Sequence, residues 1–263
     1  MTPTVTRGHD ASRYVQLGSL TKVVTGTALM RLARTGVLGL DDPLERWLPR
    51  VPACGITLRH LAEHTSGLPR LPPRTGGGDP YRAFDAAALG SVLADLATLQ
   101  TTAPGRAHQY SNLGYAVLGE ALCAAAGSRY EELVRALVLD PLGIEEMTAH
   151  PPQDRCLTGA DVLGRPRRPW TLSGAVLPAG GLWATPTATA RLVAGLLVDG
   201  VLGEPAPTWL RSGDVIWHNG TTHGVRLFAG ARADGHWVLV HRLGGPLRGA
   251  ERLGNALLAG REP

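Results

Sequence analysis

A serine and a lysine lie three residues apart, at Ser19 and Lys22, where an apolar helix is predicted to begin. Residues at i and i+3 share one face of a helix, so the hydroxyl and the amine can come within hydrogen-bond reach. A serine hydroxyl is a weak nucleophile until a neighbouring base removes its proton, and a lysine amine can be that base. The free N–H groups and the positive dipole of a helix N-terminus also suit an oxyanion beside the serine. The pair predicts acyl-transfer chemistry.

The S-x-x-K pattern is common by chance, but the composition of this chain strengthens it. Lys22 is the only lysine among 26 basic residues; all the others are arginines. Arginine does not give up its proton in a protein, whereas a lysine amine can be tuned to do so. A single lysine one turn after a serine therefore indicates a position that needs a titratable amine.

A second polar segment, Tyr110-Ser111-Asn112, stands directly before another predicted helix. A tyrosine titrates near ~10 in water, and a cationic neighbour would lower its pKa and favour the phenolate. Tyr110 could then take the serine proton and return one to the leaving group. The Asn112 amide can both donate to and accept from a substrate amide. The structural alternative is a Tyr110 ring packed under the helix with Asn112 as N-cap, and the presence of Ser19 and Lys22 favours catalysis.

A third segment, His218-Asn219-Gly220, ends a predicted strand. Gly220 permits close approach of a substrate to the backbone, and the N–H of Thr221 can complete an oxyanion hole with that of Ser19. His218 is expected to face the substrate as a donor or partial positive charge. A lone histidine on a strand is more often structural, so this segment counts only together with the other two.

The elements expected around these segments change character along the chain. Helices are predicted at about 19–35, 44–48, 58–64, 83–99, 113–126, 129–138, 186–198 and 248–259, and strands at 215–219, 225–231 and 236–242. The order predicts an α/β lobe built from residues 1–50 and 200–263, with a mostly helical lobe, residues 51–199, inserted between them.

The three motifs together, S-x-x-K, Y-S-N and H-N-G, resemble those of the class C β-lactamase-related serine hydrolases. That group lies in the superfamily of β-lactamases and penicillin-binding proteins, and it includes D-alanyl-D-alanine carboxypeptidases and esterases of similar fold. The resemblance runs from about residue 15 to residue 245 in the expected order. It implies a β-lactamase/transpeptidase-like α/β fold, an antiparallel sheet flanked by helices with an all-α insert.

The resemblance also implies roles for the motif residues. Ser19 would be acylated, and Lys22 and Tyr110 would share the role of general base. Asn112 would hold the acyl side chain of the substrate. His218 stands where the family usually has the lysine of its K-T-G motif.

The chain departs from the family pattern in two places. Members usually carry two strands and often a helix ahead of the nucleophile. The 18 residues before Ser19 are too few to form all of these elements. We therefore expect the sheet to lack its N-terminal edge strands, which leaves an uncovered edge through which copies of the chain can associate. Thr221 and His223 replace glycines that usually follow the third motif, which would narrow the cleft.

Other kinds of function find little support in the sequence. The net charge of +4 is spread along the chain without a basic helix, so we expect no nucleic-acid partner. His60 and His64 form an H-x-x-E-H pattern typical of zinc proteases, but the helix is short and no third ligand stands out, so we expect no metal and no cofactor.

The composition also bears on where the protein works. No apolar run is long enough to span a bilayer, and the first residues do not have the pattern of an export signal. The three cysteines, Cys54, Cys123 and Cys156, are odd in number and widely spaced, which fits a reducing compartment. We expect a cytoplasmic protein, or an exported one if an upstream segment is missing.

The most specific functional hypothesis is a serine hydrolase that cleaves a small ester or amide, with a β-lactam or D-alanyl peptide as further candidates. A transacylase that passes the acyl group to an amine is a second hypothesis. A third is a catalytically degenerate binding module of the same fold, against which the intact Ser19, Lys22 and Tyr110 argue.

Overall fold

The computed structural model describes residues 9–73, 78–160, 163 and 165–261. Its larger sheet has four antiparallel strands in the order β4-β5-β6-β7. The strands are β4 (Leu210–Ser212), β5 (Val215–Thr221), β6 (Val225–Arg232) and β7 (Trp237–Leu243). Three of them are the predicted strands: β5 and β6 extend two residues and one residue further than predicted, and β7 is shifted by one residue. Strand β4 was not predicted.

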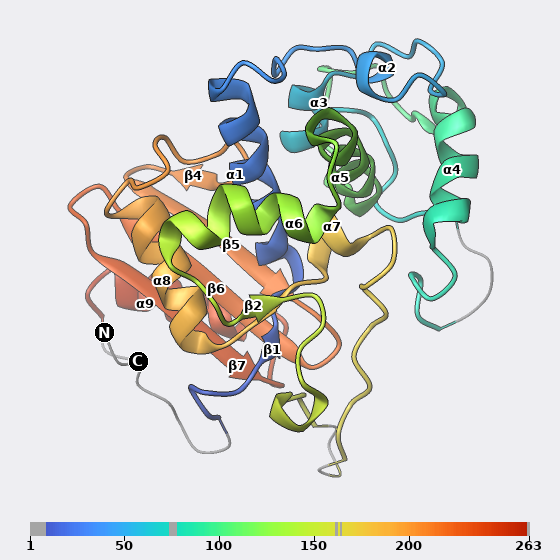
Figure 1. The fold of residues 1–263 in the computed structure, drawn as a ribbon. Coiled ribbons are helices and arrows are strands. Elements are labelled where there is room, and N and C mark those ends of the chain that lie inside the picture. Colours follow the sequence, from blue (N-terminus) through green and yellow to red (C-terminus); the bar gives the residue numbers. More distant parts are fainter. Residues whose placement is uncertain (1–8, 74–77, 161–162, 164, 262–263) are drawn as a thin grey trace.

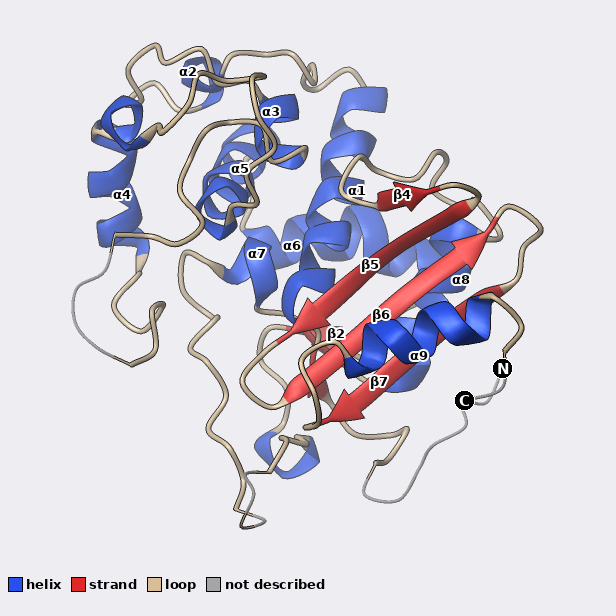
Figure 2. Ribbon diagram, turned by 180° about the vertical axis from the view of Figure 1, so that it is seen from behind, coloured by secondary structure: helices blue, strands red, loops and turns tan. Residues whose placement is uncertain are grey.

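Helices cover both faces of this sheet (Figures 1 and 2). Figure 2 shows α9 (Gly249–Leu258) across one face, while α1 (Thr21–Arg34) and α8 (Pro186–Leu197) lie behind the other. Successive residues of a strand point to opposite faces, and on β6 Leu227 joins the main core whereas Phe228 packs under α9. The antiparallel sheet flanked by helices that the sequence predicted is confirmed.

The remaining helices form the upper part of the molecule in Figure 1 and the link between it and the sheet. They are α2 (Leu44–Trp47), α3 (Leu58–Ala62), α4 (Ala86–Ala94), α5 (Asn112–Ala126), α6 (Tyr130–Val134) and α7 (Leu177–Gly180). Short 3₁₀ or π turns extend the set: η1 (Gly18–Leu20), η2 (Leu96–Leu99), η3 (Arg135–Leu139), η4 (Asp140–Leu142) and η5 (Gln153–Arg155). All the predicted helices are present, in most cases with shorter bounds.

A second, smaller sheet joins distant parts of the chain. Its three two-residue strands, in the order β1-β3-β2, are β1 (Val15–Gln16), β2 (Met147–Thr148) and β3 (Trp183–Ala184). Strands this short show no alternation of polar and apolar residues, so the sequence did not predict them. Through β1 the segment that leads to Ser19 is tied to the middle of the chain.

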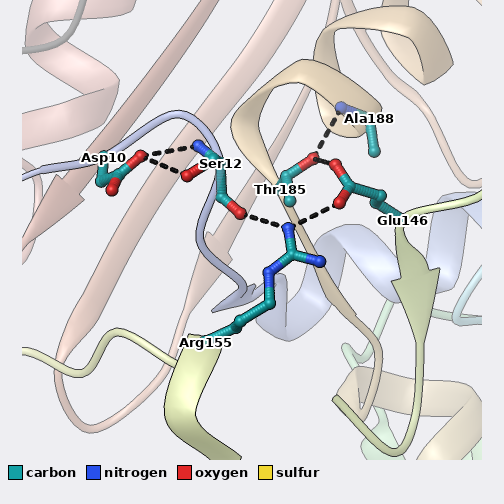
Figure 3. A network of polar contacts seen from close by, with 6 residues as sticks. All are labelled: Asp10, Ser12, Glu146, Arg155, Thr185 and Ala188. Carbon is teal, nitrogen blue, oxygen red and sulfur yellow. Dashed lines mark hydrogen bonds and ion pairs between the residues drawn. The ribbon is translucent and has the colours of Figure 1, made fainter. Parts of the chain in front are cut away.

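A polar network fixes the same segment a few residues earlier (Figure 3). Asp10 Oδ1 accepts hydrogen bonds from the Ser12 backbone N–H (2.8 Å) and hydroxyl (2.7 Å). Arg155 donates to the Ser12 carbonyl and to Glu146 Oε1 (2.6 Å). Thr185, the N-cap of α8, donates to the other oxygen of Glu146 (3.3 Å). The network connects the approach to the nucleophile with the start of α8.

Helix α1 runs through the centre of the fold. Ten of its residues are buried, among them Val23, Val24 and Leu29. They belong to one hydrophobic core that includes Leu118 of α5 and Leu227 of β6. Burial on this scale supplies most of a domain's stability, so α1 holds its first turn rigidly between the sheet and the helices.

The predicted division into two lobes stays a prediction. Helix α8, which that division assigns to the helical lobe, packs against β6 and β7. Among the described residues no further strand pairs with the outer edge of β7. Association of copies through this edge also stays a prediction.

Two further properties concern the described part of the chain. None of its helices combines the length and the apolarity that crossing a bilayer requires. Cys54, Cys123 and Cys156 all carry free thiols.

Candidate active site

Two glycines bring the turn that carries Ser19 against strand β5. Gly18 has a φ of +53°, and a Cβ there would lie 2.9 Å from the Thr221 nitrogen. A Cβ on Gly220 would lie 2.1 Å from the Leu17 carbonyl oxygen, which is far inside contact distance. The side of Gly220 where a Cβ would stand thus faces the Leu17 backbone, and its predicted role in admitting substrate stays a prediction. Its small size lets the chain itself approach.

Lys22 is fully buried one turn after Ser19. Its Nζ lies 3.3 Å from Ser19 Oγ and donates to two fixed oxygens, Asn112 Oδ1 at 2.8 Å and the Ala179 carbonyl at 2.6 Å. Burial, and to a smaller extent the Arg70 guanidinium, holds the Lys22 pKa well below its usual value. Low dielectric and a like charge both disfavour the ammonium form, so they make the neutral amine easier to reach.

Tyr110 is the second residue whose side chain contacts the Ser19 hydroxyl. Its hydroxyl donates a 2.6 Å hydrogen bond to Ser19 Oγ, and Lys22 Nζ lies 4.8 Å from the centre of its ring. The expected lowering of the Tyr110 pKa is wrong. Burial raises the pKa, and this outweighs the opposing effects of the Ser19 hydrogen bond and the Arg70 charge. Tyr110 therefore rests as a neutral phenol.

Asn112 bridges Lys22 and Tyr81, and the sequence did not indicate Tyr81 as a site residue. Its Oδ1 accepts from Lys22, and its Nδ2 donates to the Tyr81 hydroxyl at 2.7 Å. It is not the N-cap of α5: Ser111 is, with Oγ accepting from the Gly114 N–H at 2.8 Å. The cap and the functional amide are thus separate neighbouring residues, and the side chain of Asn112 is free to face the cleft.

His218 lies on β5 at the edge of the same cleft but does not carry the expected positive charge. The ring is buried, and its Nδ1 lies 2.7 Å from the Asn219 carbonyl oxygen. Burial lowers its pKa to about 4, so the imidazole is neutral at pH 7. Its Nδ1 then carries the proton that the carbonyl accepts, which leaves Nε2 as an acceptor.

The direction of the Thr221 backbone N–H follows from the hydrogen bonds between β5 and β6. Thr222 N–H donates to the Val225 carbonyl at 3.1 Å across the β5–β6 turn. Successive N–H groups of a strand point to opposite sides. The Thr221 N–H, one residue earlier, therefore points away from β6 and toward the turn that carries Ser19.

A cleft of about 660 Å³ is lined by Ser19, Tyr110, Asn112, His218 and Thr221. Its walls also include Arg70, Tyr81, Trp170 and Arg248, none of which the sequence singled out. Arg70 lies over the Tyr110 ring, 5.0 Å from its centre. Arg70 and Tyr81 flank a loop rich in proline and glycine, and no spacing rule marked them. The predicted narrowing by Thr221 and His223 stays a prediction.

The two histidines of the H-x-x-E-H pattern are engaged by backbone N–H groups. His60 Nδ1 accepts from Thr57 N–H (3.2 Å), and His64 Nδ1 accepts from Ser111 N–H (3.1 Å). Among the residues that the structure describes, no three histidine, cysteine or carboxylate side chains gather where they could hold a metal.

Comparison with known proteins places this geometry in a family. The sequence model of the family described as Beta-lactamase matches residues 5–250. The chain is 34% identical over 178 residues to the D-alanyl-D-alanine-carboxypeptidase/endopeptidase AmpH of Escherichia coli K12. That match covers 65% of this chain and 46% of AmpH. It is 37% identical over 150 residues to the esterase EstB of Burkholderia gladioli, covering 50% of this chain and 37% of EstB.

The fold has relatives among solved structures. The octameric penicillin-binding protein homologue from Pyrococcus abyssi matches with a TM-score of 0.80 at 22% identity, over 96% of this chain and 67% of that one. The chain spans less than half the length of the two relatives matched by sequence. These likenesses establish ancestry and fold.

Proposed function

The chain belongs to the β-lactamase family of serine hydrolases, and we propose that it cleaves an ester or an amide through a covalent acyl-enzyme on Ser19. One observation carries the proposal. The Tyr110 hydroxyl and the Lys22 amine both lie within hydrogen-bond distance of Ser19 Oγ, at 2.6 and 3.3 Å. A nucleophile within reach of both a base and an acid is suited to acyl transfer.

In the first half-reaction Lys22 acts as the base. Two N–H groups of the neutral amine serve Asn112 Oδ1 and the Ala179 carbonyl, so its lone pair faces Ser19. The Ser19 proton moves to Nζ while Oγ attacks the substrate carbonyl. As the substrate C–O or C–N bond breaks, the neutral phenol of Tyr110 gives its proton to the leaving group. Lys22 is then an ammonium and Tyr110 a phenolate.

The second half-reaction restores both groups. The Tyr110 phenolate takes a proton from water, which attacks the acyl carbon. Oγ of Ser19 leaves and regains its proton from the Lys22 ammonium. Over the whole cycle one water is consumed and the two products are the acid and the alcohol or amine.

The oxyanion formed in each step needs donors. The Ser19 N–H and the Thr221 N–H, which points toward the Ser19 turn, are the candidates for the oxyanion hole. Losing one such donor typically costs about 10²–10³-fold in rate. Gly18 and Gly220 hold the two backbone segments together.

The substrate is a small ester or simple amide. The cleft of about 660 Å³ is of ligand size, and Asn112, already joined to Lys22 and Tyr81, would hold the acyl side chain. AmpH and EstB, by their names, act on D-alanyl peptides and on esters, so both classes belong in the substrate screen. Transfer of the acyl group to an amine, and binding without turnover, are the competing outcomes.

A fluorophosphonate probe tests the proposal directly. We expect one adduct per chain by intact-mass spectrometry, mapped to Ser19, and none in Ser19→Ala. Hydrolysis of p-nitrophenyl esters, a chromogenic cephalosporin and a D-alanyl peptide, with and without added amines, then separates hydrolase from transacylase. Absence of adduct with any acylating probe would leave the binding module as the surviving hypothesis.

A further inference from the structure

His64 has a backbone conformation that side chains usually avoid. Its φ is +59°, and it is the one non-glycine residue with positive φ in the described part of the chain. It ends α3: the Thr65 N–H donates to the His60 carbonyl (2.8 Å) and the His64 N–H to the Leu61 carbonyl (3.4 Å). This bond pair defines the Schellman motif, whose left-handed position is usually glycine. A histidine in this left-handed conformation is sterically strained, whereas a glycine would not be.

His64 accepts hydrogen bonds from the backbone on both sides of Tyr110. Its carbonyl oxygen accepts from the Gln109 N–H at 2.7 Å, and its Nδ1 accepts from the Ser111 N–H at 3.1 Å. In an extended segment the N–H groups of residues i−1 and i+1 point to the same side. One residue therefore fixes both peptide groups that flank the catalytic tyrosine.

The ring of His64 also supports the tyrosine itself. The two ring centres are 4.4 Å apart at an interplanar angle of 37°, and the imidazole is buried, with 6% of the residue exposed. Burial is the main cause that lowers the His64 pKa to about 2, so the ring stays neutral. A neutral ring with an accepting Nδ1 carries its proton on Nε2.

We propose that His64 is a positioning residue for the reaction, which holds the Tyr110 hydroxyl at its 2.6 Å distance from Ser19 Oγ through the flanking backbone and the face of its ring. The inference rests on the proposed function of Ser19 and Tyr110. Its physical basis is that displacement of a reacting group by about 1 Å can cost on the order of 10²-fold in rate.

Two substitutions separate the contributions of this residue. Asparagine tolerates the left-handed conformation, and its Oδ1 takes the place of Nδ1 as acceptor for the Ser111 N–H. Glycine relieves the strain but provides neither acceptor nor ring. Since both suit the end of α3, His64→Asn against His64→Gly compares the presence and the absence of the acceptor.

The measurement is the rate of Ser19 acylation and the steady-state kcat and KM with an ester. We expect His64→Gly to lower kcat and the acylation rate about 10–100-fold. This is part of the ~10²–10⁴-fold rate enhancement that a general acid or base supplies. KM should stay within about twofold, and His64→Asn should recover most of the loss because it restores the acceptor. In a Tyr110→Phe background the His64→Gly effect should nearly vanish, because His64 acts through the Tyr110 hydroxyl.

The outcomes distinguish the two proposals. An unlabelled wild-type protein overturns the proposed function, and the positioning role with it. A labelled wild type with His64→Gly at full rate, or with an equal loss in the Tyr110→Phe background, overturns the positioning role alone. If the thermal midpoint shows that His64→Gly does not fold, His64→Phe is measured instead, because it keeps an aromatic ring and removes the Nδ1 acceptor; full activity in that variant contradicts the proposal.

Discussion

The Tyr110 hydroxyl donates a hydrogen bond of 2.6 Å to Ser19 Oγ. Ser19 Oγ is therefore an acceptor toward the phenol, and Lys22 Nζ lies 3.3 Å from the same oxygen, where the neutral amine of the proposed mechanism can take the serine proton. Burial acts in opposite directions on the two partners: it lowers the pKa of Lys22 and raises that of Tyr110. Both shifts favour the uncharged forms, which suits a base and an acid at the start of a reaction.

Replacing Lys22 by arginine keeps a nitrogen-bearing side chain but fixes it in the protonated form, so no free base is left beside Ser19. We expect Lys22→Arg to lose about 10³-fold or more in acylation rate, because a guanidinium does not deprotonate near neutral pH. Fluorophosphonate labelling followed by intact mass measures the rate.

Lys22→Met is the matched control, since it removes the amine without introducing a permanent cation and keeps a side chain of similar length. The two variants should be equally inactive. A near-normal rate in Lys22→Arg would show that another group takes the serine proton.

Removing the Tyr110 hydroxyl should impair both half-reactions. We expect Tyr110→Phe to lower kcat about 10²-fold, the lower end of the range for a lost acid or base. Its phenolate would activate water in the proposed second half-reaction, so the acyl-enzyme should accumulate and be visible by intact mass during turnover. Tyr81→Phe is the control: its hydroxyl accepts from Asn112 and does not contact Ser19. Equal effects of the two variants would count against Tyr110 as the acid.

The dependence of kcat/KM on pH should follow these two groups. The rate rises as Lys22 loses its proton and falls as Tyr110 ionises. Arg70 lowers the pKa of both. Arg70→Met should therefore raise both pKa values and move the whole bell-shaped profile to higher pH.

Arg129→Met provides the comparison for Arg70→Met, because Arg129 is exposed and pairs with Glu132 away from the cleft. Its profile should match that of the wild type. An unmoved profile in Arg70→Met, or a shift to lower pH, would show that other groups set the two limbs.

The close approach of strand β5 to the Ser19 turn should be sensitive to a single methyl group. In Gly220→Ala the new Cβ would meet the Leu17 carbonyl oxygen at 2.1 Å, so the turn must move. We expect a loss of about 1–3 kcal/mol in the free energy of unfolding, typical of overpacking, and a fall of about tenfold or more in kcat.

Gly90→Ala is the matched control for the glycine. Nothing lies within 4 Å of a Cβ at Gly90 in α4, and alanine should stabilise that helix by about 0.5–1 kcal/mol. Thermal unfolding and ester hydrolysis measure both variants. A Gly220→Ala protein as stable and active as wild type would mean that the turn tolerates displacement.

Local rules were enough to place much of this fold. Alternation and glycine turns located β5, β6 and β7, and α3 lies within the predicted range 58–64, capped by Thr57 Oγ1, which accepts from the His60 N–H. The i, i+3 spacing brought Ser19 and Lys22 together because both lie at one helix start. Such features depend on neighbours in sequence, which a single sequence displays.

Features that depend on distant contacts were missed or misjudged. The two-residue strands of the small sheet exist only because residues 15, 147 and 183 meet in space. The sign of the Tyr110 pKa shift depends on how deeply the ring is buried, and a list of charged neighbours cannot supply that depth. Tyr81 became visible only through its contact with Asn112.

The complete burial of Lys22 has a consequence for chemical labelling. As the chain's one lysine has no exposed surface, the native fold presents no side-chain amine to succinimidyl esters or aldehydes. Modification at Lys22 requires the centre of the fold to open, so the extent of labelling at this residue over time reports how often the protein unfolds.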